Sequence, residues 1–316
     1  MLRRFLAKAI ALSLTVFALQ VAIVAVQPVG AELRDVRALP AGKVDVVLLG
    51  DSTVFADHGS RLSTADLHQT FVPDHRVGMI AHASYHMAVY AAFARAMEEQ
   101  AYRSRRLIVP INLRSFSVSW DSQPDYQFTA TIFALEHSSL LGRAVYHPLR
   151  VFKAFDPAPD AHQRFDAMPA GGGDVAIGVM KDFSAPEYES PTIERSGRVI
   201  ALHYMSPLLR THRRVQQMVE LASRLRAVGV EPLFYVTPVD YEECASVLGP
   251  SFDERLMANV DVLRAALAAQ QVSVLDLSHL LESQFFNWRG ELYPNEHVVE
   301  EGRRRIAARL AQRLQD

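Results

Sequence analysis

The sequence predicts an α/β protein in which a parallel sheet lies between two layers of helices, a three-layer αβα arrangement of the flavodoxin-like type. Short runs of Val, Leu and Ile, bounded by turn residues, alternate with longer segments that carry apolar residues at helical spacing. Strands that are separated by helices pair in parallel, and helices then cover both faces of the sheet. The 316 residues are ample for such a core.

Four apolar runs that end at turn residues are expected to form buried strands, at 44–49, 107–111, 233–237 and 272–277. Four segments with helical periodicity are expected to cover them, at 86–102, 213–228, 252–270 and 300–314. Gly229 directly follows the second of these helices, where a glycine typically ends one. Between residues 157 and 198 no period persists, and Pro, Asp and Gly accumulate. We expect an irregular excursion there, either a lid or a partner surface.

The N-terminal segment has the composition of a targeting signal. Arg3, Arg4 and Lys8 precede an apolar run over 9–26, and the small residues at 29–31 suit a signal peptidase. Residues 1–31 are therefore interpreted as a signal peptide or an uncleaved membrane anchor. Basic residues before the run stay on the cytoplasmic side, so residues 32–316 are expected outside the cytoplasm, in the periplasm or cell envelope.

Composition excludes several classes of protein. There are 33 Lys and Arg against 35 Asp and Glu, a net charge of −2, which argues against a general nucleic-acid binder. The single cysteine, Cys244, excludes an intramolecular disulfide and a cysteine-based zinc cluster. His82 and His86 are spaced like metal ligands but lack a convincing third, and His86 equally suits a helix cap. No metal or cofactor is expected.

Residues that carry chemistry follow the predicted strands, where ligands bind in an open parallel sheet. Ser52 comes directly after the first strand, in Gly50-Asp51-Ser52, and is the candidate nucleophile or, alternatively, a helix N-cap. Asn112 follows the second strand; its amide can stabilise an oxyanion, or it is an ordinary turn residue. His297, just before the last helix, is the preferred general base. The backbone around Ser84 is a further oxyanion donor candidate.

These residues resemble the motif blocks of the SGNH hydrolase superfamily, the GDSL-like lipases and esterases. Gly50-Asp51-Ser52 is similar to the first block, and Ser84 lies where the second block has a glycine. Asn112 matches the third block, although Pro110 replaces its glycine, and His297 with Gly302 resembles the last block. The resemblance implies that 32–316 is one hydrolase-like domain and that an acylated carbohydrate or another ester is the substrate. Similar exported proteins include the D-alanine transfer proteins of teichoic acids and O-acetylation proteins of exopolysaccharides.

One position departs from that pattern. The superfamily has an aspartate three residues before the histidine, and this sequence has Pro294 there. A carboxylate at this point orients the imidazole and stabilises its charged form. Glu296 or Glu291 is expected to substitute, or a backbone carbonyl leaves a Ser-His dyad.

The sequence thus predicts an exported, serine-dependent ester hydrolase or O-acyltransferase acting on acylated cell-surface carbohydrate. Water as acceptor gives hydrolysis, and a sugar hydroxyl gives transfer. One alternative is a non-catalytic polysaccharide-binding or assembly protein with a degenerate hydrolase fold, which Pro110 and Pro294 favour. A second is a membrane-tethered scaffold that acts through the excursion.

Overall fold

The computed structural model describes residues 2–26, 33–34, 36, 44–55, 61–99, 104–117, 120, 128, 131–151, 191–288 and 294–315. Its centre is a five-stranded sheet with every pairing parallel and the order β2-β1-β3-β4-β5. This is the strand order of a flavodoxin-like sheet, so the predicted fold class is confirmed. The strands are β1 Val46–Gly50, β2 Val77–Ala81, β3 Arg106–Ile111, β4 Glu231–Val236 and β5 Val274–Asp276.

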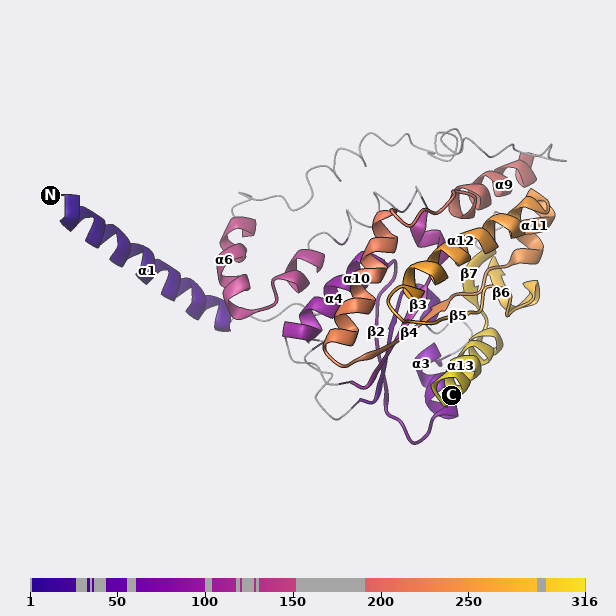
Figure 1. Ribbon diagram of the computed structural model, residues 1–316, viewed down its shortest axis with the longest axis horizontal. Coiled ribbons are helices and arrows are strands. Elements are labelled where there is room, and N and C mark those ends of the chain that lie inside the picture. Colours follow the sequence, from indigo (N-terminus) through magenta and orange to yellow (C-terminus); the bar gives the residue numbers. More distant parts are fainter. Residues whose placement is uncertain are drawn as a thin grey trace.

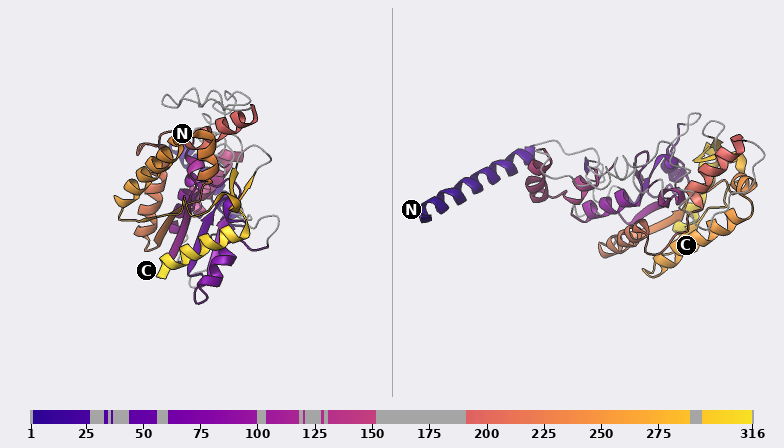
Figure 2. Two further views of the ribbon diagram at one scale, coloured as in Figure 1. Left: turned by 90° about the vertical axis from the view of Figure 1, so that its right-hand side faces the viewer. Right: turned by 90° about the horizontal axis from the view of Figure 1, so that it is seen from above.

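Helices cover the sheet on both faces and make the three layers visible in Figures 1 and 2. Alternate residues of each strand face opposite layers: Leu49 of β1 belongs to one apolar cluster and Leu48 to the other. The larger cluster holds the apolar stripes of three helices, and the smaller one includes residues of two. The helices of the first layer are α4 Met87–Glu99, α10 Arg213–Ala227 and α12 Ser251–Ala268; those of the second are α3 Thr64–Phe71 and α13 Glu300–Gln315.

All four strands expected from the apolar runs are present, within two residues or so at their ends. The fifth strand, β2, was not predicted. It lies at one edge of the sheet, and Gly78 interrupts its apolar residues, so its sequence signal is weak. The small sheet that pairs β6 Phe286–Trp288 with β7 Pro294–Val298 in antiparallel fashion was also not predicted, because both strands are very short.

The predicted excursion at 157–198 is wrong at its C-terminal end. Residues 191–198 form the first part of a regular helix, α9 Pro191–Tyr204. The helix pattern is weak in the sequence because small residues, Ser196 and Gly197, occupy the buried face between Ile193 and Ile200. The remainder of the predicted excursion lies outside the described residues. The other helices are α11 Tyr241–Leu248 and α6 Leu140–Val151.

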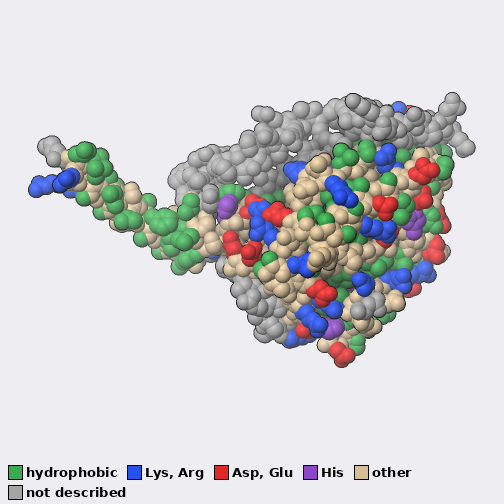
Figure 3. Space-filling view, viewed as in Figure 1, with side chains coloured by type: hydrophobic (Ala, Val, Ile, Leu, Met, Phe, Trp, Pro, Cys, Tyr) green, Lys and Arg blue, Asp and Glu red, His purple; other side chains and the backbone are tan. Residues whose placement is uncertain are grey.

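The N-terminal helix, α1 Leu2–Val26, projects from the α/β body as an apolar rod with basic residues at its tip (Figure 3). It is 25 residues long and its most apolar window has a mean hydropathy of 2.4, with 6% of that window buried. Its length and composition suffice to cross a bilayer, a property that signal sequences share with anchors.

Candidate active site

The candidate site residues gather where the strand order of the sheet reverses. From β1 the chain proceeds to the edge strand β2, whereas β3 leads to β4 on the other side. The loops that leave β1 and β3 therefore diverge at the carboxyl ends of the strands, which is the place where open parallel sheets bind their ligands. Ser52 follows β1 and Asn112 follows β3, so the two residues flank this point from neighbouring strands.

Ser52 begins a tight turn, the 3₁₀ segment Ser52–Val54. The turn requires the glycine before it: a Cβ at Gly50 would lie 2.3 Å from a methyl carbon of Val54. The residue that caps the turn is Asp51, not Ser52. The Ser52 hydroxyl is thus not used as the cap, which removes the structural role that the sequence had left open for it.

Asp51 joins the Ser52 turn to Asn112. Its carboxylate is 2% exposed and accepts bonds from the Thr53 backbone N–H at 2.8 Å and the Thr53 hydroxyl at 2.6 Å. The second carboxylate oxygen accepts the Asn112 Nδ2–H at 3.2 Å. Asn112 Oδ1 in turn accepts the Arg114 backbone N–H at 3.0 Å, which fixes which end of the amide is the donor. An amide nitrogen carries two N–H bonds, and the bond to Asp51 uses one of them.

His297 reaches Ser52 from a distant part of the chain. It lies on β7, one residue before the strand ends, and Val298 leads into α13. Its Nε2 is 2.8 Å from Ser52 Oγ, across a sequence separation of 245 residues. Both side chains are partly exposed, so a substrate can approach them. The 2.8 Å distance is that of a hydrogen bond between the hydroxyl and the ring nitrogen, and a histidine nitrogen in this position is the arrangement that activates a serine.

Ser84 lies in the turn between β2 and α4 and has a φ of +67°, in the left-handed region that favours glycine. Among the described residues only one other non-glycine, Gln271, has a positive φ. The same turn is tied to the nucleophile strand, because the His82 N–H donates to the Gly50 carbonyl at 3.3 Å. Ser84 therefore has the backbone conformation of the glycine that it replaces in the sequence resemblance.

We expect Ser84→Gly to keep both stability and activity, and Ser84→Val to lose stability by about 1–2 kcal/mol, since a β-branched residue is strained at this φ. If the backbone N–H of residue 84 stabilises the oxyanion, that stabilisation is kept in Ser84→Gly; if the hydroxyl does so, it is lost. Chemical denaturation measures the stability of the two variants, and ester turnover measures their activity. Loss of turnover in a stable Ser84→Gly protein would contradict the backbone assignment.

Glu296, the candidate for the carboxylate that orients the His297 imidazole, binds other residues instead. Its side chain is 4% exposed, accepts the hydroxyl of Tyr204, and lies 3.0 Å from Arg114 Nη2 in a buried ion pair. Adjacent residues on a strand point to opposite faces, so Glu296 and His297 leave β7 in opposite directions. Glu291, the other carboxylate considered, lies outside the described residues.

This buried cluster of Arg114, Glu296 and Tyr204 joins three parts of the site. Arg114 comes from the segment after Asn112, Glu296 from the His297 strand, and Tyr204 from the end of α9. Burial, together with the Glu296 charge, raises the pKa of the Tyr204 hydroxyl, which therefore stays protonated and donates. Burial and the Arg114 charge lower the pKa of the neighbouring His203 to about 3, so this imidazole is neutral near pH 7.

The residues of this cluster were only partly foreseen. In the sequence, Arg114, Trp120 and Tyr126 form a polar and aromatic stretch after Asn112, a composition that suits stacking on sugar faces or a scaffold for the loop. The Arg114 guanidinium lies over the Trp120 ring at 5.0 Å and is nearly buried, an arrangement that favours the scaffold. Tyr204 had no local signal, because only the tertiary structure brings α9 to β7.

A second Ser-His-Asp arrangement occurs at the end of β5. Ser278 Oγ is 3.0 Å from His279 Nδ1, and His279 Nε2 is 2.7 Å from an oxygen of Asp253. The Ser278 side chain is fully buried, at 0% exposure, so no substrate reaches its hydroxyl. Accessibility therefore distinguishes Ser52 from Ser278 as the candidate nucleophile.

The histidine pair considered as a metal site has another arrangement. The carbonyl of the buried His86 accepts the N–H groups of Val89 and Tyr90, and its Nδ1 accepts the N–H of Ala88. His86 thus caps α4, while His82 is exposed in the preceding turn. In the part of the chain that the structure describes, no group of three or more His, Cys, Asp or Glu side chains could hold a metal ion.

Comparison with known proteins finds likeness only among solved structures. No family model and no curated protein matches the sequence. The aryl esterase of M. smegmatis aligns with 85% of this chain and 97% of its own, at 9% identity and a TM-score of 0.37. A carbohydrate acetylesterase family member from Sinorhizobium meliloti aligns with 86% of this chain and 98% of its own, at 10% identity and a TM-score of 0.38. Likeness at this level assigns no activity, which has to be argued from the chain's own residues.

Proposed function

We propose that the protein is a serine-dependent ester hydrolase or O-acyltransferase that uses Ser52 and His297. The observation that carries this proposal is the 2.8 Å contact between Ser52 Oγ and His297 Nε2, at the carboxyl edge of the sheet and in partly exposed surroundings. The resemblance of four sequence blocks to SGNH hydrolases supports the same assignment. A purely structural role for Ser52 would not explain why a partly exposed imidazole from the other sheet lies within hydrogen-bond distance of its hydroxyl.

The proposal assigns each part of an acyl transfer to a group of this chain. His297 Nε2 takes the proton of the Ser52 hydroxyl while Oγ forms a bond to the ester carbonyl carbon. The negative charge that develops on the carbonyl oxygen is stabilised by the Asn112 amide and by backbone N–H groups at Ser52 and Ser84. The carbon–oxygen bond to the alcohol then breaks, and His297 returns the proton to the departing alkoxide.

The second half of the reaction regenerates Ser52. Water or an acceptor hydroxyl gives its proton to His297 and attacks the acyl-enzyme carbonyl, and the Ser52 oxygen leaves and is reprotonated. We take an acylated carbohydrate of the cell surface as the substrate class, because the leader, the Thr-Pro-Val segment at 237–239 and the predicted excursion resemble exported proteins that modify cell-surface polymers. Residues 32–316 would then act outside the cytoplasm, exported by the N-terminal segment 1–31.

A serine-reactive fluorophosphonate tests the proposal. We expect one equivalent to label Ser52, identified by peptide mass spectrometry, with no label on the buried Ser278. His297→Asn is expected to slow labelling strongly, because the hydroxyl loses its base. An unlabelled Ser52 in the folded protein would support the alternative, a polysaccharide-binding protein with a degenerate hydrolase fold.

A further inference from the structure

The end of α1 is attached to the α/β body by two contacts. Helix α6 packs against it, and Arg143 Nη2 donates to the Val24 carbonyl at 3.0 Å. Val24 is the buried residue of α1, at 1% exposure, whereas the rest of the helix is largely exposed. Shortly after α1, Val36 is buried in the larger core cluster of the domain. The position at which α1 leaves the body is therefore fixed beside α6 (Figure 1).

Exposed apolar side chains concentrate on α6. Within the described residues outside α1, three of the five large apolar side chains that are exposed belong to this helix; the five are Leu62, Leu140, Leu141, Val145 and Leu209. At 100° per residue, Leu140, Leu141, Ala144 and Val145 fall within an arc of about 140°. Ala144, inside that arc, is 1% exposed. The helix thus has an apolar face that protein atoms cover only in part.

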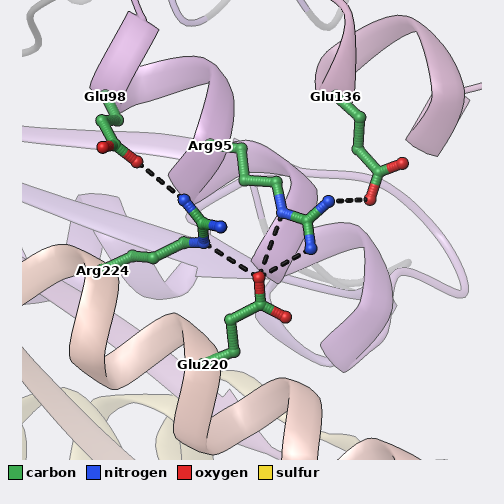
Figure 4. Close-up of polar contacts among 5 residues, drawn as sticks. All are labelled: Arg95, Glu98, Glu136, Glu220 and Arg224. Atoms are coloured by element: carbon green, nitrogen blue, oxygen red, sulfur yellow. Dashed lines mark hydrogen bonds and ion pairs between the residues drawn. The ribbon is translucent and has the colours of Figure 1, made fainter.

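The segment directly before α6 is bound to the core helices of the domain. The helical segment 131–136 precedes α6, and Glu136 pairs with Arg95 of α4 at 2.6 Å. Arg95 also binds Glu220 of α10, which in turn binds Arg224, so that one network ties this region to two core helices (Figure 4). Although partial burial opposes its ionisation, the hydrogen bonds from the two arginines lower the pKa of Glu220. The network therefore fixes the point from which the chain enters α6, a few residues after Glu136.

We propose that α1 remains attached as a membrane anchor and that α6 lies on the surface of the same bilayer, with Leu140, Leu141 and Val145 in its interfacial region. A 25-residue helix is about 37 Å long, enough to cross the hydrocarbon core. A helix that packs on the exit of such a span lies at the membrane surface. Arg3 and Arg4 at the far end of α1 place that end in the cytoplasm, so α6 lies on the opposite surface.

The exposed apolar face of α6 is continuous with the apolar surface of α1, and a lipid bilayer would cover both. The exposed apolar side chains of α1 favour the hydrocarbon core of the bilayer, and those of α6 lie beside the end of α1, at the level of the bilayer surface. Contact of both helices with the bilayer would also fix the orientation of the α/β domain relative to the membrane. This proposal is independent of the chemistry at Ser52, so either can fail without the other.

The test uses the full-length chain in vesicles of phosphatidylethanolamine and phosphatidylglycerol, with an environment-sensitive NBD label on single introduced cysteines. The native Cys244 is 1% exposed, and burial raises the pKa of its thiol, so it does not compete for the label. The test position is Leu141→Cys and the matched control is Leu209→Cys, since these leucines are 62% and 63% exposed. Leu14→Cys, in the middle of α1, reports insertion of the anchor.

We expect the label at 141 to emit at shorter wavelength than that at 209 and to be quenched several-fold more by lipids with a spin label near the headgroup. The label at 14 should be quenched by a deep spin label. If 14 is embedded but 141 behaves like 209, α6 does not touch the bilayer. If 14 is not embedded, the anchor is absent. Shielding of 141 that depends on protein concentration and not on the spin-labelled lipid would assign this face to a second copy of the chain.

Discussion

Ser52→Ala is expected to lower ester turnover by the purified domain by at least about 10³-fold while leaving the fold intact. The hydroxyl is the atom that His297 Nε2 contacts at 2.8 Å, and alanine removes it without disturbing the cap, which Asp51 provides. Short-chain aryl esters give the initial readout, and kcat/KM is the quantity to compare. Because the pair acts as a unit, adding His297→Ala to Ser52→Ala should cause little further loss.

The chain offers a matched control for this experiment in its second Ser-His-Asp arrangement. Ser278→Ala removes a hydroxyl that also lies beside a histidine nitrogen, at 3.0 Å, but is inaccessible to substrate. Turnover should be unchanged for the folded Ser278→Ala protein. Equal turnover by Ser52→Ala and the parent protein would overturn the acyl-transfer assignment, and the architecture alone would remain.

Glu296→Ala is expected to lower the free energy of unfolding by about 3–5 kcal/mol, because it leaves a nearly buried arginine without its counter-charge. The lost carboxylate lies 3.0 Å from Arg114 Nη2 and also accepts the Tyr204 hydroxyl, so two buried groups lose their partner at once. Urea denaturation followed by circular dichroism measures the change.

Glu300→Ala is the control for that measurement. Glu300 lies four residues further on and pairs with Arg304 on the surface of α13, at 2.8 Å, in a contact that is 36–39% exposed. Exposed pairs of this kind contribute about 1 kcal/mol or less. A loss for Glu296→Ala no greater than that for Glu300→Ala would mean that the buried cluster does not stabilise this side of the site.

The fold was predictable because its signals are local. The runs that became β1, β3, β4 and β5 are apolar on both faces, as strands covered by helices must be. The edge strand β2 has no such run, because Gly78 interrupts its apolar residues; incomplete burial is not the reason, since the other edge strand, β5, is half-buried as well. The helix α9 was missed because Ser196 and Gly197 interrupt the apolar residues of its buried face.

The candidate site was predictable only in part. Ser52 and Asn112 could be paired from sequence because consecutive strand ends of a parallel sheet share one edge. His297 was preferred by its position before the last helix, and the structure brings it to Ser52. The environment of Glu296 could not be derived, because strand alternation turns it away from His297 and its partners come from two other elements. No local pattern records that convergence.

Ser52 and His297 come from two different sheets, so the activity of the protein would depend on how these two sheets are held together. The Asp51 carboxylate, directly after β1, accepts hydrogen bonds from Thr53 in the turn that carries Ser52 and from Asn112, so the nucleophile turn and the candidate oxyanion donor form one rigid half. The imidazole arrives on a two-stranded ribbon that belongs to a different sheet. Loosening that ribbon would separate His297 from Ser52 while the larger core cluster, to which the ribbon contributes no residue, stays folded. Activity would then be lost before the domain unfolds.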